Sequence, residues 1–228
     1  MSKKNNEPGK YIAIGDIHGC CRSIKELLKK LEPYKDHQLV FVGDYIDRGP
    51  CSRQVVSLMI ELQEKRDCIF LRGNHEEMLL KAVENGHRKL WIHNGGQSTL
   101  RSYGLSDQDL DLPEDHMEFY RNTVLYYDTP DYFFVHAGAP PFQSIEKSID
   151  DPEAVRYFLW TREHINAIET AWEKTVVFGH TPRSNPIKRP KMIGIDTGCV
   201  YSSIGYGKLT ALVLPEEKFI QQYSLDND

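Results

Sequence analysis

Leu39-Val-Phe-Val-Gly-Asp-Tyr-Ile-Asp-Arg-Gly-Pro50 is the stretch from which the fold can be worked out. Its first four residues are apolar, and glycine, two carboxylates and an arginine follow them. A short apolar run that stops at glycine and charged residues is typical of a buried strand with a polar loop at its end. From Ser52 to Lys65 the apolar residues recur at helical spacing. The segment therefore predicts a strand, a polar loop and a helix, in that order.

The same order recurs on both sides of this segment. Tyr11 to Ile14 reads as a strand, and Ser23 to Leu31 follows it with a helical pattern. Ile69 to Leu71 reads as a third strand, with a helix predicted from Glu76 to Val83. Strands that alternate with helices indicate a largely parallel sheet covered by helices. The first half of the chain therefore predicts an α/β fold.

The second half has a different pattern. Residues 85–131 are polar and weakly periodic, so we expect an insertion of helices and loops there. Beyond it we expect strands with no clear helix between most of them, which favours a second sheet that is mixed or antiparallel. The architecture predicted from the pattern is an α/β sandwich with two sheets. The expected strands are Tyr132–Val135, Val176–Phe178, Met192–Ile195, Leu209–Leu214 and Phe219–Tyr223.

Composition limits the class of protein. The 228 residues contain no repeat or Gly/Ser linker, so we expect a flexible tail at residues 1–9 and a single domain at 10–228. The net charge of -5 gives no reason to expect nucleic acid as a partner, and no apolar run is long enough to span a membrane. Five cysteines without a CxxC pair indicate a reduced, cytoplasmic environment rather than a disulfide framework. The sequence does not fix the oligomeric state, for which a monomer is the simplest expectation.

Five polar motifs each follow an expected strand directly. In open α/β sheets, ligands bind in the crevice beyond the carboxyl ends of the strands, so these motifs are expected to converge on one site. The five motifs are Gly15-Asp-Ile-His-Gly19, Gly43-Asp-Tyr-Ile-Asp-Arg-Gly-Pro50, Arg72-Gly-Asn-His-Glu76, His136-Ala-Gly138 and Phe178-Gly-His-Thr181.

The motifs supply two carboxylates, one amide oxygen and three imidazoles, which are too many ligands for one four-coordinate ion. They suit two ions that share a bridging carboxylate, from Asp16 or Asp44. A nitrogen and oxygen ligand set favours Mn, Fe or Zn, and suits Mg less. Two divalent ions about 3.5–4 Å apart activate a bridging water and hold phosphate oxygens during in-line attack. The candidate metal ligands are Asp16, His18, Asp44, Asn74, His136 and His180.

The remaining charged residues of the motifs suit the binding and cleavage of a phosphate ester. Arg48 and Arg72 can bind phosphate oxygens, because the planar guanidinium matches an oxyanion. His75 adjoins a metal ligand and can protonate the leaving alkoxide as a general acid, with Asp47 holding its other nitrogen. The histidines outside the motifs are expected to be solvated or to cap helices. These are His37, His87, His93, His116 and His164.

These motifs resemble, in the same order, those of the phosphoprotein phosphatases within the calcineurin-like metallophosphoesterases. The match extends from about Lys10 to Leu214, and three further segments resemble the compact bacterial and phage lambda-type branch: Asn94-Gly-Gly96, Leu159-Trp-Thr-Arg-Glu163 and Ile195-Asp-Thr-Gly198. The resemblance implies a four-layer α/β/β/α metallophosphoesterase sandwich with two mixed β-sheets. It also implies dephosphorylation of phosphoserine and phosphothreonine, and sometimes phosphotyrosine, in proteins, with Mn common in bacterial members.

The resemblance also implies a role for each residue of the site. A metal-bridging hydroxide attacks in line, with His75 and Asp47 as the catalytic pair. Arg48, Arg72 and Arg162 contact phosphate, on a phosphorylated protein or a small phosphomonoester. The first metal takes Asp16, His18 and Asp44, and the second takes Asp44, Asn74, His136 and His180.

Two other functions remain open. The first is a dinucleotide polyphosphate hydrolase resembling the diadenosine tetraphosphatases, which share most of the metal ligands. Those enzymes tend to lack the equivalent of Asp47 and to carry Asp in place of Glu76, so both residues favour the protein phosphatase. The second is a non-catalytic binding module, against which the complete ligand set argues. Asp196-Thr-Gly198 on its own also resembles an aspartic protease signature, but its simplest role is a turn in the wall of the site.

Overall fold

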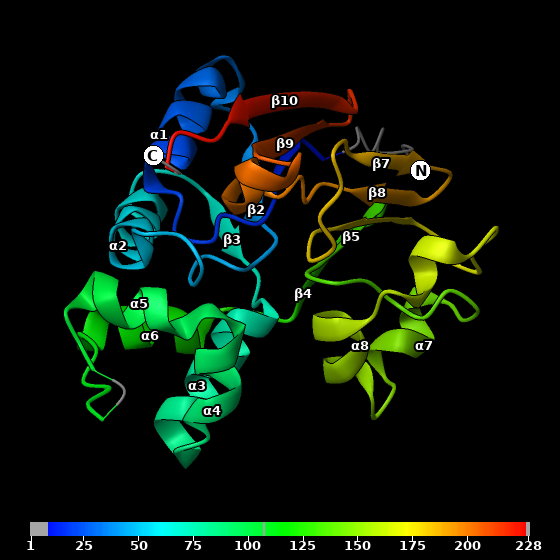
Figure 1. Cartoon of the computed structure of the whole chain (residues 1–228). Coiled ribbons are helices and arrows are strands. Elements are labelled where there is room, and N and C mark those ends of the chain that lie inside the picture. Colours follow the sequence, from blue (N-terminus) through cyan, green and yellow to red (C-terminus); the bar gives the residue numbers. More distant parts are fainter. Residues whose placement is uncertain (1–8, 107, 227–228) are drawn as a thin grey trace.

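The computed structural model describes residues 9–106 and 108–226 and contains two five-stranded sheets (Figure 1). The strand order of the first sheet is β10-β9-β1-β2-β3, and that of the second is β4-β5-β6-β8-β7. In the first sheet, β1, β2 and β3 run parallel, whereas β9 and β10 are antiparallel to their neighbours. The strands of this sheet are β1 Tyr11–Ile14, β2 Gln38–Phe41, β3 Cys68–Phe70, β9 Lys208–Leu214 and β10 Lys218–Tyr223.

The second sheet is also mixed. Its central strands β5, β6 and β8 are parallel, and the edge strands β4 and β7 pair antiparallel with them. Residues 1–8 of the expected tail lie outside the described residues. The strands of this sheet are β4 Tyr126–Asp128, β5 Tyr132–Val135, β6 Thr175–Phe178, β7 Ile187–Arg189 and β8 Met192–Gly194.

Helices cover the outer faces of the two sheets. Figure 1 shows α1 and α2 beside the first sheet, and α7 and α8 beside the second. The structure also has 3-10 helices at Glu32–Tyr34, Glu163–Asn166 and Cys199–Ile204 and a π-helix at Ile92–Gly96. The helices are α1 Cys21–Lys30, α2 Ser52–Gln63, α3 Asn74–Asn85, α4 Arg88–Trp91, α5 Gln97–Tyr103, α6 Glu114–Asn122, α7 Ile145–Ile149 and α8 Ala154–Trp160.

The alternation of side chains along each strand produces the layers. On β1, Ile12 and Ile14 belong to the core beneath α1 and α2, whereas Ala13 belongs to the core between the sheets. On β6, Val177 faces the core between the sheets, and Phe178 belongs to the core beneath α7 and α8. Successive residues of a strand point to opposite faces, so the central strands β1 and β6 are buried on both sides. This arrangement confirms the predicted α/β fold with two mixed sheets.

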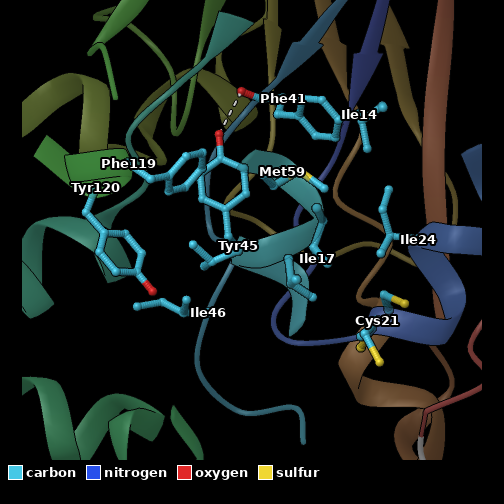
Figure 2. Close-up of a cluster of buried hydrophobic side chains, with 14 of the residues drawn as sticks. Ile14, Ile17, Cys21, Ile24, Phe41, Tyr45, Ile46, Met59, Phe119 and Tyr120 are labelled. Carbon is cyan, nitrogen blue, oxygen red and sulfur yellow. Dashed lines mark hydrogen bonds between the residues drawn. The ribbon is translucent and has the colours of Figure 1, made fainter. Parts of the chain in front are cut away.

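Tyr45 belongs to the polar motif after β2, but its side chain lies at the centre of the largest core (Figure 2). Its ring packs edge-on against Phe119, with the ring centroids 5.3 Å apart. Its hydroxyl donates to the carbonyl of Leu71 at 2.8 Å, so the polar atom of this fully buried ring has a partner. The loop after β2 is therefore anchored in the core on one side while its charged residues face the site on the other.

Part of the expected second sheet was wrong. The predicted strands near Leu209–Leu214 and Phe219–Tyr223 are β9 and β10, which join the first sheet instead. β9 is buried along nearly its whole length because it lies between β1 and β10. The sequence pattern also missed α7 and α8, which lie between β5 and β6 and are only 5 and 7 residues long. Helices of one or two turns have little periodicity to detect.

The expectation that the histidines outside the motifs are solvated was wrong for His37, His116 and His164, which are buried. His164 is fully buried against Phe178, with ring centroids 4.5 Å apart. Neither of its ring nitrogens has a hydrogen-bond partner among the described residues. Burial, with the nearby Arg189 charge, lowers the pKa of His164 from 6.5 to about 4.

This buried imidazole should make the protein sensitive to acid. The unfolded chain takes up the proton near pH 6.5 but the folded chain resists it down to about pH 4. The stability associated with neutral His164 is therefore complete above pH 6.5 and is lost as the pH falls toward 4, by about 3 kcal/mol in all. We expect His164→Leu to flatten the pH dependence of the free energy of unfolding in that window, as measured by urea titration. The exposed His87→Leu serves as the control and should keep the wild-type slope; equal slopes in all three proteins would contradict the assignment.

Candidate metal centre

The loops that carry the motifs have an unusual backbone. His18, Asp44, Asp47, Arg48 and His180 all have positive φ values, between 47° and 72°. Residues other than glycine rarely adopt this left-handed conformation, and each costs on the order of 1–3 kcal/mol unless its surroundings hold it. The expected site residues thus lie where the chain turns sharply at the carboxyl ends of the strands. Such turns aim several side chains at one point.

Glu76 holds the most important of these turns. Its carboxylate accepts hydrogen bonds from the backbone N–H groups of Asp44, Tyr45 and Gly73, each at 2.9 Å. A Cβ atom at Gly73 would lie only 2.1 Å from Asp44 Oδ1, so only glycine allows this close approach. Glu76 therefore ties the loop after β2 to the start of α3. In the sequence, Glu76 only helped to distinguish the protein phosphatases from the diadenosine tetraphosphatases. Its role in holding the loop of Asp44 was missed.

The expected metal ligands form two clusters that share one carboxylate oxygen. Asp44 Oδ2 lies 3.5 Å from His18 Nε2 and 3.5 Å from His136 Nε2. On the second side, Asn74 Oδ1 lies 2.9 Å from both His136 Nε2 and His180 Nδ1. Of the two carboxylates that were candidates for a bridge, Asp44 is the one that both clusters contain.

The imidazoles present their lone pairs to these clusters. His18 Nδ1 lies 2.8 Å from the carbonyl of Ile46, and His136 Nδ1 lies 2.8 Å from the carbonyl of Val42. A carbonyl only accepts, so each Nδ1 carries the proton and each Nε2 carries the lone pair that can ligate a metal. Burial lowers the pKa of His18, His136 and His180. The three rings are therefore neutral, which is the form that binds a metal.

Asp16 is the remaining expected ligand of the first metal. Its two carboxylate oxygens accept the backbone N–H of His180 at 3.1 and 3.0 Å, which links the two sheets. Burial raises the pKa of Asp16, and the charges of Asp196 and Asp44 raise it further. Asp16 would therefore need a nearby cation to remain ionised. The donor set and the free lone pairs thus fit two divalent metals, which the six residues named from the sequence would hold.

His75 and Asp47 form a closely held pair. His75 Nδ1 lies 2.6 Å from Asp47 Oδ2, while Asp47 also accepts from Trp91 Nε1 at 2.9 Å and Thr99 Oγ1 at 2.6 Å. Burial opposes the protonation of His75, but the nearby Asp44 charge and the Asp47 hydrogen bond outweigh it and raise its pKa. His75 Nε2 is buried 4.0 Å from Asp44 Oδ2 and has no hydrogen-bond partner in the described part of the chain. Among the described residues, this nitrogen is therefore left without a hydrogen bond on the side of His75 that faces Asp44.

Helices α4 and α5, in the segment that follows α3, hold Asp47, the partner of His75, in place. The sequence did not indicate this role of the two helices. Trp91 and Thr99, which hold Asp47, come from α4 and α5. Gly95, between these helices, accepts the backbone N–H of Arg48 at 3.3 Å. Its φ of 112° and its close approach to Arg48 require glycine, which explains the Asn94-Gly-Gly96 segment.

The three expected phosphate-binding arginines are placed differently. Arg48 Nη1 lies 2.5 Å from His18 Nε2, and Arg162 donates to Thr181 Oγ1 at 3.3 Å beside His180. Both guanidinium groups thus border the ligand clusters. The Arg72 guanidinium instead bonds Glu77 at 3.2 Å and Thr123 Oγ1 at 3.1 Å, so its donors are engaged along α3 and the end of α6.

Asp196 is a further charged residue of the site. It is buried, and its Oδ1 accepts the backbone N–H of Gly198 at 2.9 Å. Its charge acts on Asp16, and its own pKa is raised to about 7, mainly by burial. The sequence assigned this residue to a turn in the wall of the site. The structure confirms the turn and adds a buried carboxyl group beside the first metal ligand.

Comparison with known proteins agrees with this geometry. Residues 9–206 match the calcineurin-like phosphoesterase family. The chain belongs to this family. It is 31% identical to the bis(5'-nucleosyl)-tetraphosphatase PrpE [asymmetrical] of Oceanobacillus iheyensis, over 91% of the chain and 89% of that protein. It is also 31% identical to the protein of the same name from Halalkalibacterium halodurans, over 91% of each.

Solved structures of this calcineurin-like phosphoesterase fold agree as well. A protein provisionally named a diadenosine tetraphosphatase superposes with a TM-score of 0.67 at 27% identity, over 95% of this chain and 94% of that one. A serine/threonine phosphatase of Saccharomyces cerevisiae superposes with a TM-score of 0.64 at 16% identity, over 97% of this chain and 81% of that one, which shows the fold alone. Among the described residues, no helix has the length and apolar character needed to cross a bilayer.

The shared carboxylate leads to a prediction about metal content. We expect His18→Asn to weaken the binding of one metal, and Asp44→Asn to weaken both, because only Asp44 contributes to the two clusters. The loss in affinity should be at least the roughly 10–100-fold that removing an outer partner of a ligand costs. Metal bound after dialysis against Mn would be counted by mass spectrometry, with the exposed Asp131→Asn as the control. Two tightly bound metals in folded Asp44→Asn would rule out its bridging role.

Proposed function

We propose that this phosphoesterase hydrolyses dinucleoside tetraphosphates asymmetrically, releasing a nucleoside monophosphate and a nucleoside triphosphate. The observation that carries the proposal is the 31% identity to tetraphosphatases over about nine tenths of both chains. These relatives support this function better than the protein phosphatase that Asp47 and Glu76 favoured at the level of sequence. Both residues have structural roles here, since one holds His75 and the other holds the loop of Asp44. Neither role depends on the substrate being a protein.

The two metals, for which Mn is our first choice, would activate the attacking water and neutralise phosphate oxygens when bound. Asp16, His18 and Asp44 would hold one, and Asp44, Asn74, His136 and His180 the other. Arg48 and Arg162 border both clusters, so they would bind the non-bridging oxygens of the phosphate under attack. His75 would donate the proton at Nε2 to the oxygen of the P–O bond that breaks. Arg72 would have to leave Glu77 to take part, so we give it a secondary role.

A protein phosphatase acting on phosphoserine or phosphothreonine is the second candidate. The observation that favours it is the pair of His75 and Asp47, joined at 2.6 Å and buried together. A serine alkoxide is a strong base and leaves only if it is protonated, so a buried general acid suits a phosphate monoester. The leaving group of a dinucleoside tetraphosphate is a phosphate oxygen with a pKa near 6, which needs little help. The site can therefore act on both kinds of substrate.

Product analysis tests the proposed function directly. The purified protein, loaded with Mn, would be incubated with diadenosine tetraphosphate, and the nucleotides separated by ion-exchange chromatography. We expect AMP and ATP in equal amounts and no ADP, with activity abolished by EDTA. Phosphoserine and phosphotyrosine peptides and p-nitrophenyl phosphate would be compared by kcat/KM in the same buffer. A higher kcat/KM for the peptides would move the assignment to the second candidate, and two molecules of ADP would exclude asymmetrical cleavage.

The role of His75 can be separated from metal binding by the choice of leaving group. We expect His75→Asn to lower kcat for a phosphoserine peptide by roughly 10²–10⁴-fold, because the alkoxide then leaves unprotonated. The loss for diadenosine tetraphosphate should be much smaller, since its leaving group is a weak base. Metal content should stay at the wild-type value, which dialysis and mass spectrometry would check. An equal loss for every substrate would mean that His75 positions the substrate or the metals instead of transferring a proton.

A further inference from the structure

A groove opens beside the second ligand cluster, at the end of α8. Trp160 forms one wall, and its ring centroid lies 6.2 Å from that of His180, with the two rings nearly perpendicular. Arg162 belongs both to this groove and to the site, because its guanidinium donates to Thr181 next to His180. The groove is thus continuous with the metal centre. It is lined by Arg156, Tyr157, Trp160, Thr161, Arg162 and Glu163.

The indole of Trp160 is more exposed than those of the other two tryptophans. Trp91 and Trp172 are buried, and each donates its indole N–H within the protein. Trp160 instead remains 39% exposed beside two arginines. Trp160 thus offers part of an aromatic face to solvent in a groove that Arg162 shares with the site. An aromatic face between cationic groups is the chemistry that binds a nucleobase together with its phosphates.

The charges of the groove have the right sign for such a ligand. Arg156 makes an exposed ion pair with Glu153, at 3.4 Å and with both side chains more than half exposed, and its guanidinium lies 5.8 Å from the centroid of the Tyr157 ring. Pairs of this kind contribute little stability, so the Arg156 guanidinium can exchange its partner for a phosphate. Arg156 lies one helical turn before Trp160, and Arg162 lies two residues after it. The two arginines therefore stand on either side of Trp160 in the chain and line the same groove.

We propose that this groove binds one nucleoside end of the substrate, with the base stacked on Trp160 and the adjoining phosphates on Arg162 and Arg156. This inference rests on the proposed function and names the part of the chain that recognises a nucleotide. The metals and their ligands recognise phosphate only. The groove supplies the contact that a simple phosphomonoester lacks, so it determines specificity.

Intrinsic fluorescence offers a test that needs no turnover. A non-hydrolysable methylene analogue of diadenosine tetraphosphate would be titrated into the Mn-loaded protein, beside inorganic tripolyphosphate, which has the charge but no base. We expect the analogue to quench tryptophan emission and tripolyphosphate to leave it nearly unchanged. The quenching should disappear in Trp160→Phe, because the other two tryptophans are buried. Quenching that persists in this variant, or that tripolyphosphate reproduces, would overturn the proposal.

Affinity provides the second measurement. By calorimetry, Trp160→Ala should bind the analogue on the order of tenfold more weakly, as expected for the loss of one base stack. Its affinity for tripolyphosphate should change much less, whereas Arg156→Ala should weaken both ligands. The matched controls are Tyr223→Ala, an exposed aromatic on β10, and Arg101→Ala, an exposed arginine on α5. An unchanged affinity of Trp160→Ala for the analogue would place the base elsewhere.

The failure of this inference differs from that of the proposed function. If the wild type cleaves diadenosine tetraphosphate and Trp160→Ala does so with the same KM, the groove is not the nucleoside site although the function stands. If the analogue binds through Trp160 but is never cleaved in its natural form, the groove stands and the function fails. A phosphotyrosine peptide that quenches Trp160 at lower concentration than the analogue would assign the groove to a protein substrate and overturn the proposal.

Discussion

The position of one carboxylate oxygen, Oδ2 of Asp44, constrains the whole site. It lies 3.5 Å from an imidazole nitrogen of His18 on one side and 3.5 Å from that of His136 on the other. Reaching this point requires Asp44 to adopt a positive φ, which its neighbours must hold in place. The Glu76 carboxyl group does so by accepting from three backbone N–H groups, and a hydrogen bond contributes about 0.5–1.5 kcal/mol. The strain at Asp44 is therefore offset by a network that reaches from the loop after β2 to the first turn of α3.

The position of Asp44 Oδ2 between His18 and His136 also explains why the site needs two sheets. The first sheet supplies Asp16, His18 and Asp44, and the second supplies His136 and His180. Hydrogen bonds cross between them within the site, including those from His136 Nδ1 to the carbonyl of Val42 and from the backbone N–H of His180 to Asp16. Apolar residues of both sheets fill the space between them and so fix how far apart the two groups of ligands lie. The core between the sheets is therefore also part of the metal centre.

The sequence predicted these ligands because each one follows an apolar run that could only be a buried strand. Every expected metal ligand lies in or beside one of the two clusters, since the carboxyl ends of parallel strands meet at one edge. What could not be predicted depends on contacts distant in sequence. The hydrogen bonds of Trp91 and Thr99 to Asp47, and the engagement of Arg72 with Thr123, join elements that no local pattern relates. The placement of β9 in the first sheet likewise depends on pairing with β1, some 200 residues earlier.

Separate groups of residues would bind the phosphate and protonate the leaving group, and this separation accounts for the likeness of the site to both phosphatases and tetraphosphatases. The candidate metal ligands and Arg48 would surround a phosphate without regard to what it is attached to. The pair of His75 and Asp47 would add the ability to expel a strongly basic leaving group, which a phosphoanhydride does not need but tolerates. Neither of these two groups of residues distinguishes a nucleotide from a phosphoprotein. Discrimination must come from surface beyond the reacting phosphate, where binding can favour one substrate over another. In this chain the surface next to the second ligand cluster carries an exposed tryptophan between two arginines, and that surface matches a nucleotide better than it matches a phosphoserine, which has no aromatic ring to stack.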